Sequence, residues 1–156
     1  MKTKSAPARA AVRKSQPLGA LPEWNLADLY SGIESPEVMA DLARGEVECI
    51  AFEESYKGKL ADIARSDVAG AGLHAAVVRF EMIEELLGRL VSFAVLLYSG
   101  NTTDPKRAKF YGDVQERVTG ASSHLLFFPL ELNRVDDALI EKPLAHPEFG
   151  RYRPWI

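Results

Sequence analysis

Apolar residues recur at steps of three, four or seven along most of the chain after residue 35, as they do on one face of an α-helix. The first predicted helix starts at Pro36, with Ser35 as its N-cap and Glu37 facing the positive helix end. It continues to about Lys57, where Gly58 is placed to end or bend it. Its apolar stripe consists of Val38, Leu42, Cys49, Phe52 and Tyr56.

The second predicted helix begins either after Asp67 or after the glycine-rich break at residues 70–72, and it continues to Tyr98. Residues 86–98 are apolar on nearly all sides, but Arg89 interrupts a run already shorter than the roughly 20 residues of a membrane span. We therefore expect a central helix that is buried on several sides, and no membrane partner. Its stripe consists of Val77, Phe80, Ile83, Leu87, Leu90, Ala94 and Leu97.

A third helix is predicted from Pro105, with Asp104 as its N-cap, until Pro129 kinks or ends it. Its expected inner face consists of Ala108, Tyr111, Val114 or Gln115, Val118 and Leu125. A short fourth helix over 130–142 would turn Leu132, Val135 and Leu139 inward, and residues 146–156 would begin a fifth. Strand, hairpin and repeat patterns are missing from the sequence, which predicts an all-α fold of long antiparallel helices.

Residues 1–20 have a different composition from the rest of the chain. They are basic, with no acidic residue before Glu23, and carry too few apolar residues to form a core, which predicts a disordered tail before a helical body at 21–156. They contain no apolar segment typical of a secretory signal, although a transit peptide stays an alternative. Trp24, Leu26, Leu29 and Tyr30 are expected to hold the entering chain against the body. The basic residues of the tail are Lys2, Lys4, Arg9, Arg13 and Lys14.

The formal net charge is −3, and basic residues after the tail alternate with acidic ones. A nucleic-acid partner is therefore not expected, because a phosphate-binding face needs clustered Lys and Arg. The single Cys49 excludes an internal disulfide, which fits the cytoplasm, and it is interpreted as a small apolar core residue.

The sequence contains no residues to which catalytic, cofactor-binding or metal-binding roles can be assigned. His74, His124 and His146 are far apart, and none belongs to an H-E-x-x-H zinc motif. His74 and His124 are expected on helix surfaces or between helices, and His146 in a turn. Nucleophile and phosphate-loop motifs are also missing, so an independent hydrolase has no nameable nucleophile or base. The adjacent acidic pairs are predicted to lie on solvated helix faces, since neighbouring residues on a helix point about 100° apart: Glu53-Glu54, Glu84-Glu85 and Asp136-Asp137.

Four stretches, in order, resemble the N-terminal helical region of the oligoendopeptidase F family of zinc metallopeptidases. They are W-N-L-x-D-L-Y at 24–30, F-E-E-S-Y-K-G-K-L at 52–60, G-R-L-V-S-F-A-x-L-L-Y-S-G-N-T-T-D-P at 88–105, and L-x-F-F-P-L-E-L at 125–132. The resemblance covers most of residues 21–156, and the order and spacing of the four are more specific than any single stretch. It departs from the family at Gly100-Asn101, where the family has a small residue and an acid.

The resemblance implies a mostly helical, two-lobed enzyme that encloses a channel and cleaves short peptides, with zinc in the C-terminal lobe. The family's H-E-x-x-H helix and its downstream Glu ligand have no counterpart here. The chain would therefore form a non-catalytic part of the N-terminal lobe, inactive alone, and the apolar R-Y-R-P-W-I at 151–156 leads us to expect that it stops inside that lobe. The alternative is a free-standing helical scaffold with an acidic surface that binds proteins or peptides.

Overall fold

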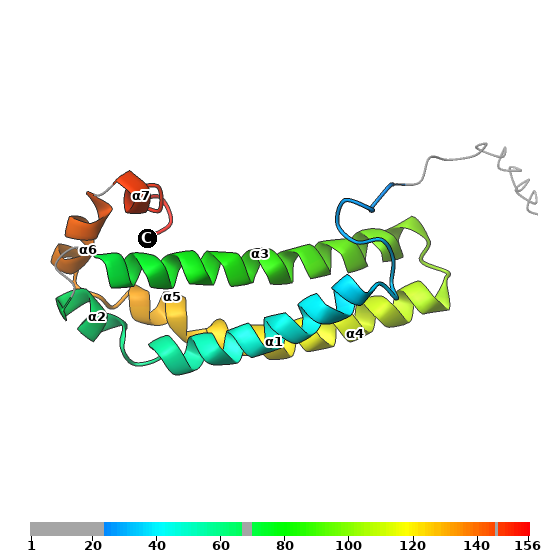
Figure 1. Cartoon of the computed structure of the whole chain (residues 1–156), viewed down its shortest axis with the longest axis horizontal. Helices are drawn as coiled ribbons and strands as arrows, with labels where there is room; N and C mark the ends of the chain where they lie inside the picture. The colour runs from blue at the N-terminus through cyan, green and yellow to red at the C-terminus, as the bar shows by residue number, and fades with distance from the viewer. Residues whose placement is uncertain (1–23, 67–69, 146) are drawn as a thin grey trace, which may run out of the picture.

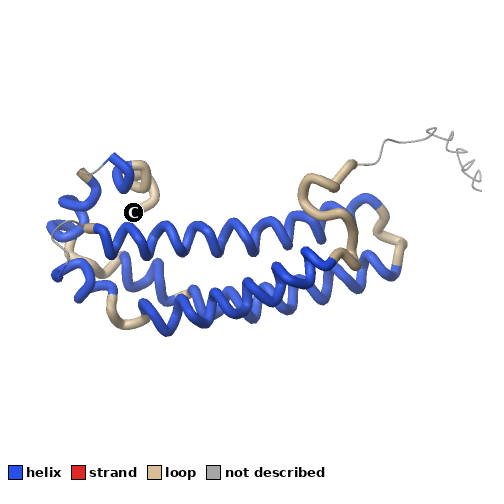
Figure 2. The backbone as a smooth tube through the Cα atoms, in the orientation of Figure 1, coloured by secondary structure: helices blue, strands red, loops and turns tan. Residues whose placement is uncertain are grey.

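A computed structural model of the chain describes residues 24–66, 70–145 and 147–156 (Figure 1). Over these residues it contains helices and turns and no strand, which confirms the predicted all-α fold (Figure 2). The predicted tail and the predicted turn at His146 lie outside the described residues. The helices are α1 (Pro36–Tyr56), α2 (Leu60–Ser66), α3 (Ala71–Gly100), α4 (Pro105–Ser122), the 3-10 turn η1 (Ser123–Leu125), α5 (Phe127–Leu132), α6 (Asp137–Leu144) and α7 (Pro147–Gly150).

The three long helices α1, α3 and α4 form an elongated bundle in which each contacts the other two. Helix α3 runs antiparallel to both α1 and α4 (Figure 1). The short helices α2, α5, α6 and α7 gather at the end of the bundle where α3 begins, and the segment 24–35 lies at the opposite end. The predicted antiparallel arrangement of long helices is therefore confirmed.

Side-chain caps fix the starts of two long helices. The Ser35 hydroxyl accepts the Val38 N–H at 3.4 Å, and the Asp104 carboxylate accepts the Lys106 N–H at 2.8 Å. Both caps precede a proline at the first helical position, as the sequence predicted. Helix α3 starts at Ala71, inside the glycine-rich break, and its N-cap Gly70 has a φ of 75°.

The apolar stripes of α1 and α3 meet in two buried clusters. Between the clusters, the two helices approach closely at Gly45, where an added Cβ would lie 2.8 Å from Leu87 Cδ2. One cluster lies at the end of the bundle where a loop joins α3 to α4, and we call it the loop-end core. It consists of Tyr30, Val38, Leu42, Leu90, Phe93, Ala94, Phe110 and Val114. The other cluster lies at the end covered by the short helices, and we call it the cap-end core. It includes Cys49, Phe52, Leu60, Leu73, Val77, Ile83, Leu87, Leu125, Phe128, Leu132, Val135 and Phe149.

The central placement of residues 86–98 is confirmed only in part. Leu90 and Phe93 are buried between α1 and α4, but Gly88, Arg89 and Ser92 are exposed, so α3 keeps one solvent face. Among the described residues, none of the helices is long and apolar enough to span a membrane.

The predicted inner face of α4 was wrong at Ala108, which is exposed, and of the alternatives Val114 and Gln115 the structure buries Val114. Phe110 takes the inward place at the start of the helix, and Val114 is the buried member of the alternative pair. Phe110 lies four residues before Val114 on the buried face, whereas Ala108 is two residues from Phe110 and therefore points about 200° away from it, toward solvent.

The remaining helix boundaries also differ from the predictions. Helix α4 ends at Ser122, before Pro129. Pro129 lies in the first turn of α5, where a missing N–H costs little because the N–H groups of a first turn have no acceptor within the helix. The continuous fourth helix over 130–142 was wrong, because α5 ends at Leu132 and Asp136 caps a new helix by accepting the Ala138 N–H at 2.8 Å. Helix α2 was not predicted, and the fifth helix is only the short α7, followed by turns.

Candidate functional site

The first and third family-like stretches contact each other at the loop end of the bundle. The rings of Tyr30 and Phe93 lie 5.2 Å apart in an edge-on arrangement. The Tyr30 hydroxyl donates to Asp41 at 2.8 Å and accepts from Arg89 Nε at 3.1 Å, and Arg89 also donates to Asp41 at 2.6 Å. Burial and the Asp41 carboxylate raise the pKa of Tyr30. This network holds segment 24–30 against α1 and α3.

The second and fourth stretches contact each other at the cap end. The Phe52 ring lies 5.1 Å from Phe128, and both Glu131 carboxylate oxygens accept the backbone N–H of Gly58, at 2.8 and 2.9 Å. Gly58 has a φ of 76°, which favours glycine at this turn. The Glu131 side chain therefore fixes the turn between α1 and α2 from a distant part of the sequence.

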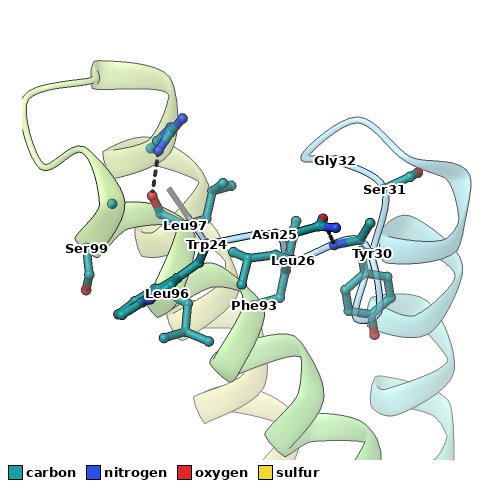
Figure 3. Close-up of a pocket in the computed structure, with 13 residues that line it drawn as sticks. Trp24, Asn25, Leu26, Tyr30, Ser31, Gly32, Phe93, Leu96, Leu97 and Ser99 are labelled. Atoms are coloured by element: carbon teal, nitrogen blue, oxygen red, sulfur yellow. Dashed lines mark hydrogen bonds between the residues drawn. The ribbon is translucent and has the colours of Figure 1, made fainter. Parts of the chain in front are cut away.

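A cavity of about 520 Å³ lies between segment 24–32 and the C-terminal half of α3 (Figure 3). Trp24, although mostly exposed, lies beside Leu96 at its edge. Arg107, the one charged side chain in its lining, already donates to the Leu97 carbonyl at 3.1 Å and pairs with Asp104 at 3.6 Å. The cavity therefore offers apolar contact and polar rims, and no paired acid and base. Its other lining residues are Asn25, Leu26, Ala27, Tyr30, Ser31, Gly32, Phe93, Ser99 and Gly100.

A second hollow, of about 600 Å³, lies between α3 and the C-terminal segment. We call it the aromatic–acidic groove, and its lining consists of Val77, Phe80, Glu81, Glu84, Glu85, Tyr152 and Trp155. The Phe80 ring stacks on Phe128 at 4.7 Å and lies 5.8 Å from Trp155. Glu81 accepts hydrogen bonds from the Tyr152 hydroxyl at 2.5 Å and from Arg151 at 2.8 Å, which ties the C-terminal turn to α3.

The two described histidines pack between helices, as predicted. His74 lies against the rings of Phe149 and Tyr152, at 5.5 and 6.2 Å. His124 Nδ1 contacts the carboxylate of Glu53, and hydrogen bonds from His124 first and Lys57 second lower the pKa of Glu53. A lowered folded-state pKa stabilises the fold above the ordinary carboxyl pKa, and this contribution is lost as pH falls through the lowered value.

Cys49 is fully buried in the cap-end core, which confirms its interpretation as an apolar core residue. Burial, followed by the charges of Glu84 and Glu48, raises its pKa to about 11. The thiolate is therefore scarce near neutral pH, and a nucleophilic role has no support. Among the described residues, no group of three or more His, Cys, Asp or Glu side chains is placed to hold a metal ion.

The acidic pairs are used in different ways. Glu53 binds His124 while Glu54 is exposed, and Asp136 caps α6. Glu84 and Glu85 are both exposed, as predicted, yet both line the aromatic–acidic groove. The sequence carried a signal for this groove that was not used: acids at helical spacing on α3, and an exposed Trp155 in the C-terminal segment.

No known protein family, curated protein or solved structure matches the chain. The relationship to oligoendopeptidase F therefore stays a prediction that depends on the four stretches.

Proposed function

We propose that this chain is a non-catalytic helical part of a zinc-dependent oligoendopeptidase that hydrolyses short peptides in the cytoplasm. In this proposal the chain shapes and walls the peptide channel and is inactive alone. The proposal extends the family resemblance, and it makes the long bundle, not any single side chain, the functional unit.

The observation that carries the proposal is the pairwise contact of the four family-like stretches. Tyr30 of the first bonds Arg89 of the third across 59 residues, and Gly58 of the second bonds Glu131 of the fourth across 73 residues. Each of these bonds joins two elements that are distant in the sequence. Stretches retained because they support a common fold are expected to meet in this way.

The residues of this chain would contribute shape, exclusion of water and contacts to the peptide backbone. The resemblance implies zinc in the C-terminal lobe, so in the proposed enzyme the metal is held outside this sequence. There it would activate water for attack on the peptide carbonyl. Short peptides are the proposed partners, and they would meet this chain only together with the catalytic lobe.

A comparison of two purified proteins tests the proposal: the 156-residue chain, and the whole product of the gene that encodes it. We expect the whole product to hydrolyse a short fluorogenic peptide and to lose this activity with a zinc chelator, and we expect the chain alone to be inactive with or without added zinc. A whole product without peptidase activity would refute the proposal, and hydrolysis by the chain alone would refute the non-catalytic role.

One observation favours a second candidate, a free-standing module that binds proteins or peptides. The aromatic–acidic groove has the exposed tryptophan and the charged rim that are common at binding surfaces. This candidate requires that the chain function as a separate protein, whereas the peptidase proposal requires a longer one.

A further inference from the structure

We propose that the aromatic–acidic groove binds a cationic amphipathic helix supplied by another polypeptide segment. Three features of the chain favour this occupant: the aromatic floor of the groove, its acids without an ion pair among the described residues, and the exposed stripe on the neighbouring face of α3. The inference does not depend on the peptidase proposal, because each of these features belongs to the described chain.

The floor of the groove provides an apolar anchor. Trp155 is 50% exposed, and its ring lies 5.8 Å from the partly exposed Phe80, which in turn stacks on the buried Phe128. The two outer rings are thus supported from below and open above. Supported aromatic rings of this kind dominate binding energy at interfaces, since they bury large area with little loss of conformational freedom.

The rim of the groove selects the charge of the occupant. Arg151 already neutralises Glu81, through a hydrogen bond of 2.8 Å. Within the described part of the chain, by contrast, no ion pair engages the exposed Glu84 or Glu85. A partner that carries Lys or Arg beside its apolar residues would pair with these two carboxylates, and an acidic partner would be repelled.

The face of α3 beyond the groove favours a helix as the occupant. Glu81, Glu85, Gly88 and Ser92 are exposed and spaced by four, three and four residues, so they form one stripe along the helix. A Cβ at Gly88 would meet no atom within 4 Å. Figure 1 shows α7 and segment 24–35 near opposite ends of α3. The stripe residues Glu85, Gly88 and Ser92 are open to solvent in the described structure. The stripe is about 16 Å long, the length of a helix of three turns.

Binding is tested with a synthetic 18-residue amphipathic helix made of Leu, Ala, Lys and Arg, labelled with fluorescein. The experiment uses the Trp24→Phe variant, in which Trp155 is the single tryptophan, so that its fluorescence reports on the groove. We expect saturable binding with one peptide per chain, a blue shift of Trp155 emission, and weaker binding at 500 mM than at 50 mM salt. A scrambled peptide with the same charge but no apolar face should bind at least about tenfold more weakly, because it cannot anchor on the rings.

Charge reversal separates the groove from general attraction to an acidic protein. The double variant Glu84→Lys/Glu85→Lys should weaken binding about tenfold or more. Its matched control, Glu54→Lys/Glu116→Lys, changes the net charge equally at exposed positions outside the groove and should change the affinity less than twofold. Trp155→Ala should also weaken binding, and circular dichroism confirms that each variant is folded.

Several outcomes would overturn the proposal. Equal losses in the two double variants would show non-specific attraction, and no saturable binding would leave the groove without this occupant. If deletion of residues 1–20 raised the affinity about tenfold, the basic tail of the same chain would be the occupant. A dimer that Glu84→Lys/Glu85→Lys dissociates would identify a second copy instead. The proposal requires an affinity unchanged by the deletion and a monomeric chain.

Discussion

Phe93 joins the parts of the loop-end core through its ring contacts. Its ring lies 5.2 Å from Tyr30 in the entering segment and 5.8 Å from Phe110 in α4, both edge-on. It is 1% exposed. This side chain of α3 therefore connects the N-terminal segment with α4. Its removal would leave a cavity that rigid helices cannot easily close.

We expect Phe93→Ala to lower the free energy of unfolding by about 3–5 kcal/mol, the usual cost of truncating a buried Phe. Met82→Ala is the matched control, because Met82 is on the same helix but is 64% exposed. Its cost should stay below about 1 kcal/mol. Equilibrium denaturation measures both. A cost for Phe93→Ala as small as that of the control would refute its placement in the core.

The burial of single residues was predictable where periodicity alone decides it, as for Leu90 and Cys49. Periodicity failed at the start of α4, where steps of three from Val114 lead to Tyr111 and the exposed Ala108, but a step of four leads to the buried Phe110. It also says nothing of polar contacts between distant residues. The bond from the Gly58 N–H to Glu131 exists only because tertiary packing brings helix α5 against the turn between α1 and α2.

At the scale of elements, starts were easier to predict than junctions. Ser35 and Asp104 are local signals, since each side chain binds a backbone N–H two or three residues away. The ends of α4 at Ser122 and of α5 at Leu132 have no such signal, although Asp136 caps the helix that follows. They depend on how α5 and α6 fill the cap end around the buried rings there, a requirement that no local pattern encodes.

Gly58 and Gly70 provide a matched pair for testing the junctions. Both have a positive φ, 76° and 75°, so Ala at either position carries the same backbone strain, about 1–2 kcal/mol. A Cβ at Gly58 would meet nothing within 4 Å, but one at Gly70 would lie 2.4 Å from Pro143 Cβ and 2.9 Å from its Cα. We therefore expect Gly70→Ala to cost about 1–3 kcal/mol more than Gly58→Ala, because α6 must move.

Thermal or denaturant unfolding of the two variants measures this difference. Equal costs at the two positions would contradict the close approach of α6 to the start of α3.

At the scale of the whole molecule, the described groups with chemical reactivity hold the bundle together. The chemically reactive groups are used internally: Cys49 is buried, and His124 and Glu53 bind each other. What the described surface offers is the aromatic–acidic groove, the cavity beside segment 24–32 and a set of exposed apolar side chains. The latter are Trp24, Met39, Val47, Ile50, Met82, Leu126, Leu130 and Trp155.

The sequence marks the acids and the tryptophan of the groove separately, but it could not predict that they lie together, for a geometric reason. The two aromatic residues of its floor are Phe80 and Trp155, which are separated by most of the second half of the chain. They meet only because α4 to α7 return along the bundle. The fold class was within reach, because a 3.6-residue period and proline-marked helix starts define long helices locally. The relative placement of short helices was not, since it depends on packing alone.

The central claim, that these residues belong to a longer zinc peptidase, is tested most directly by the mass and sequence of the native protein. An antibody raised against residues 24–66 would isolate it from its source cells, and mass spectrometry would identify its peptides. We expect a product much larger than 17.2 kDa that contains an H-E-x-x-H peptide and zinc. A native product of 17.2 kDa, or a longer one without that motif, would contradict it.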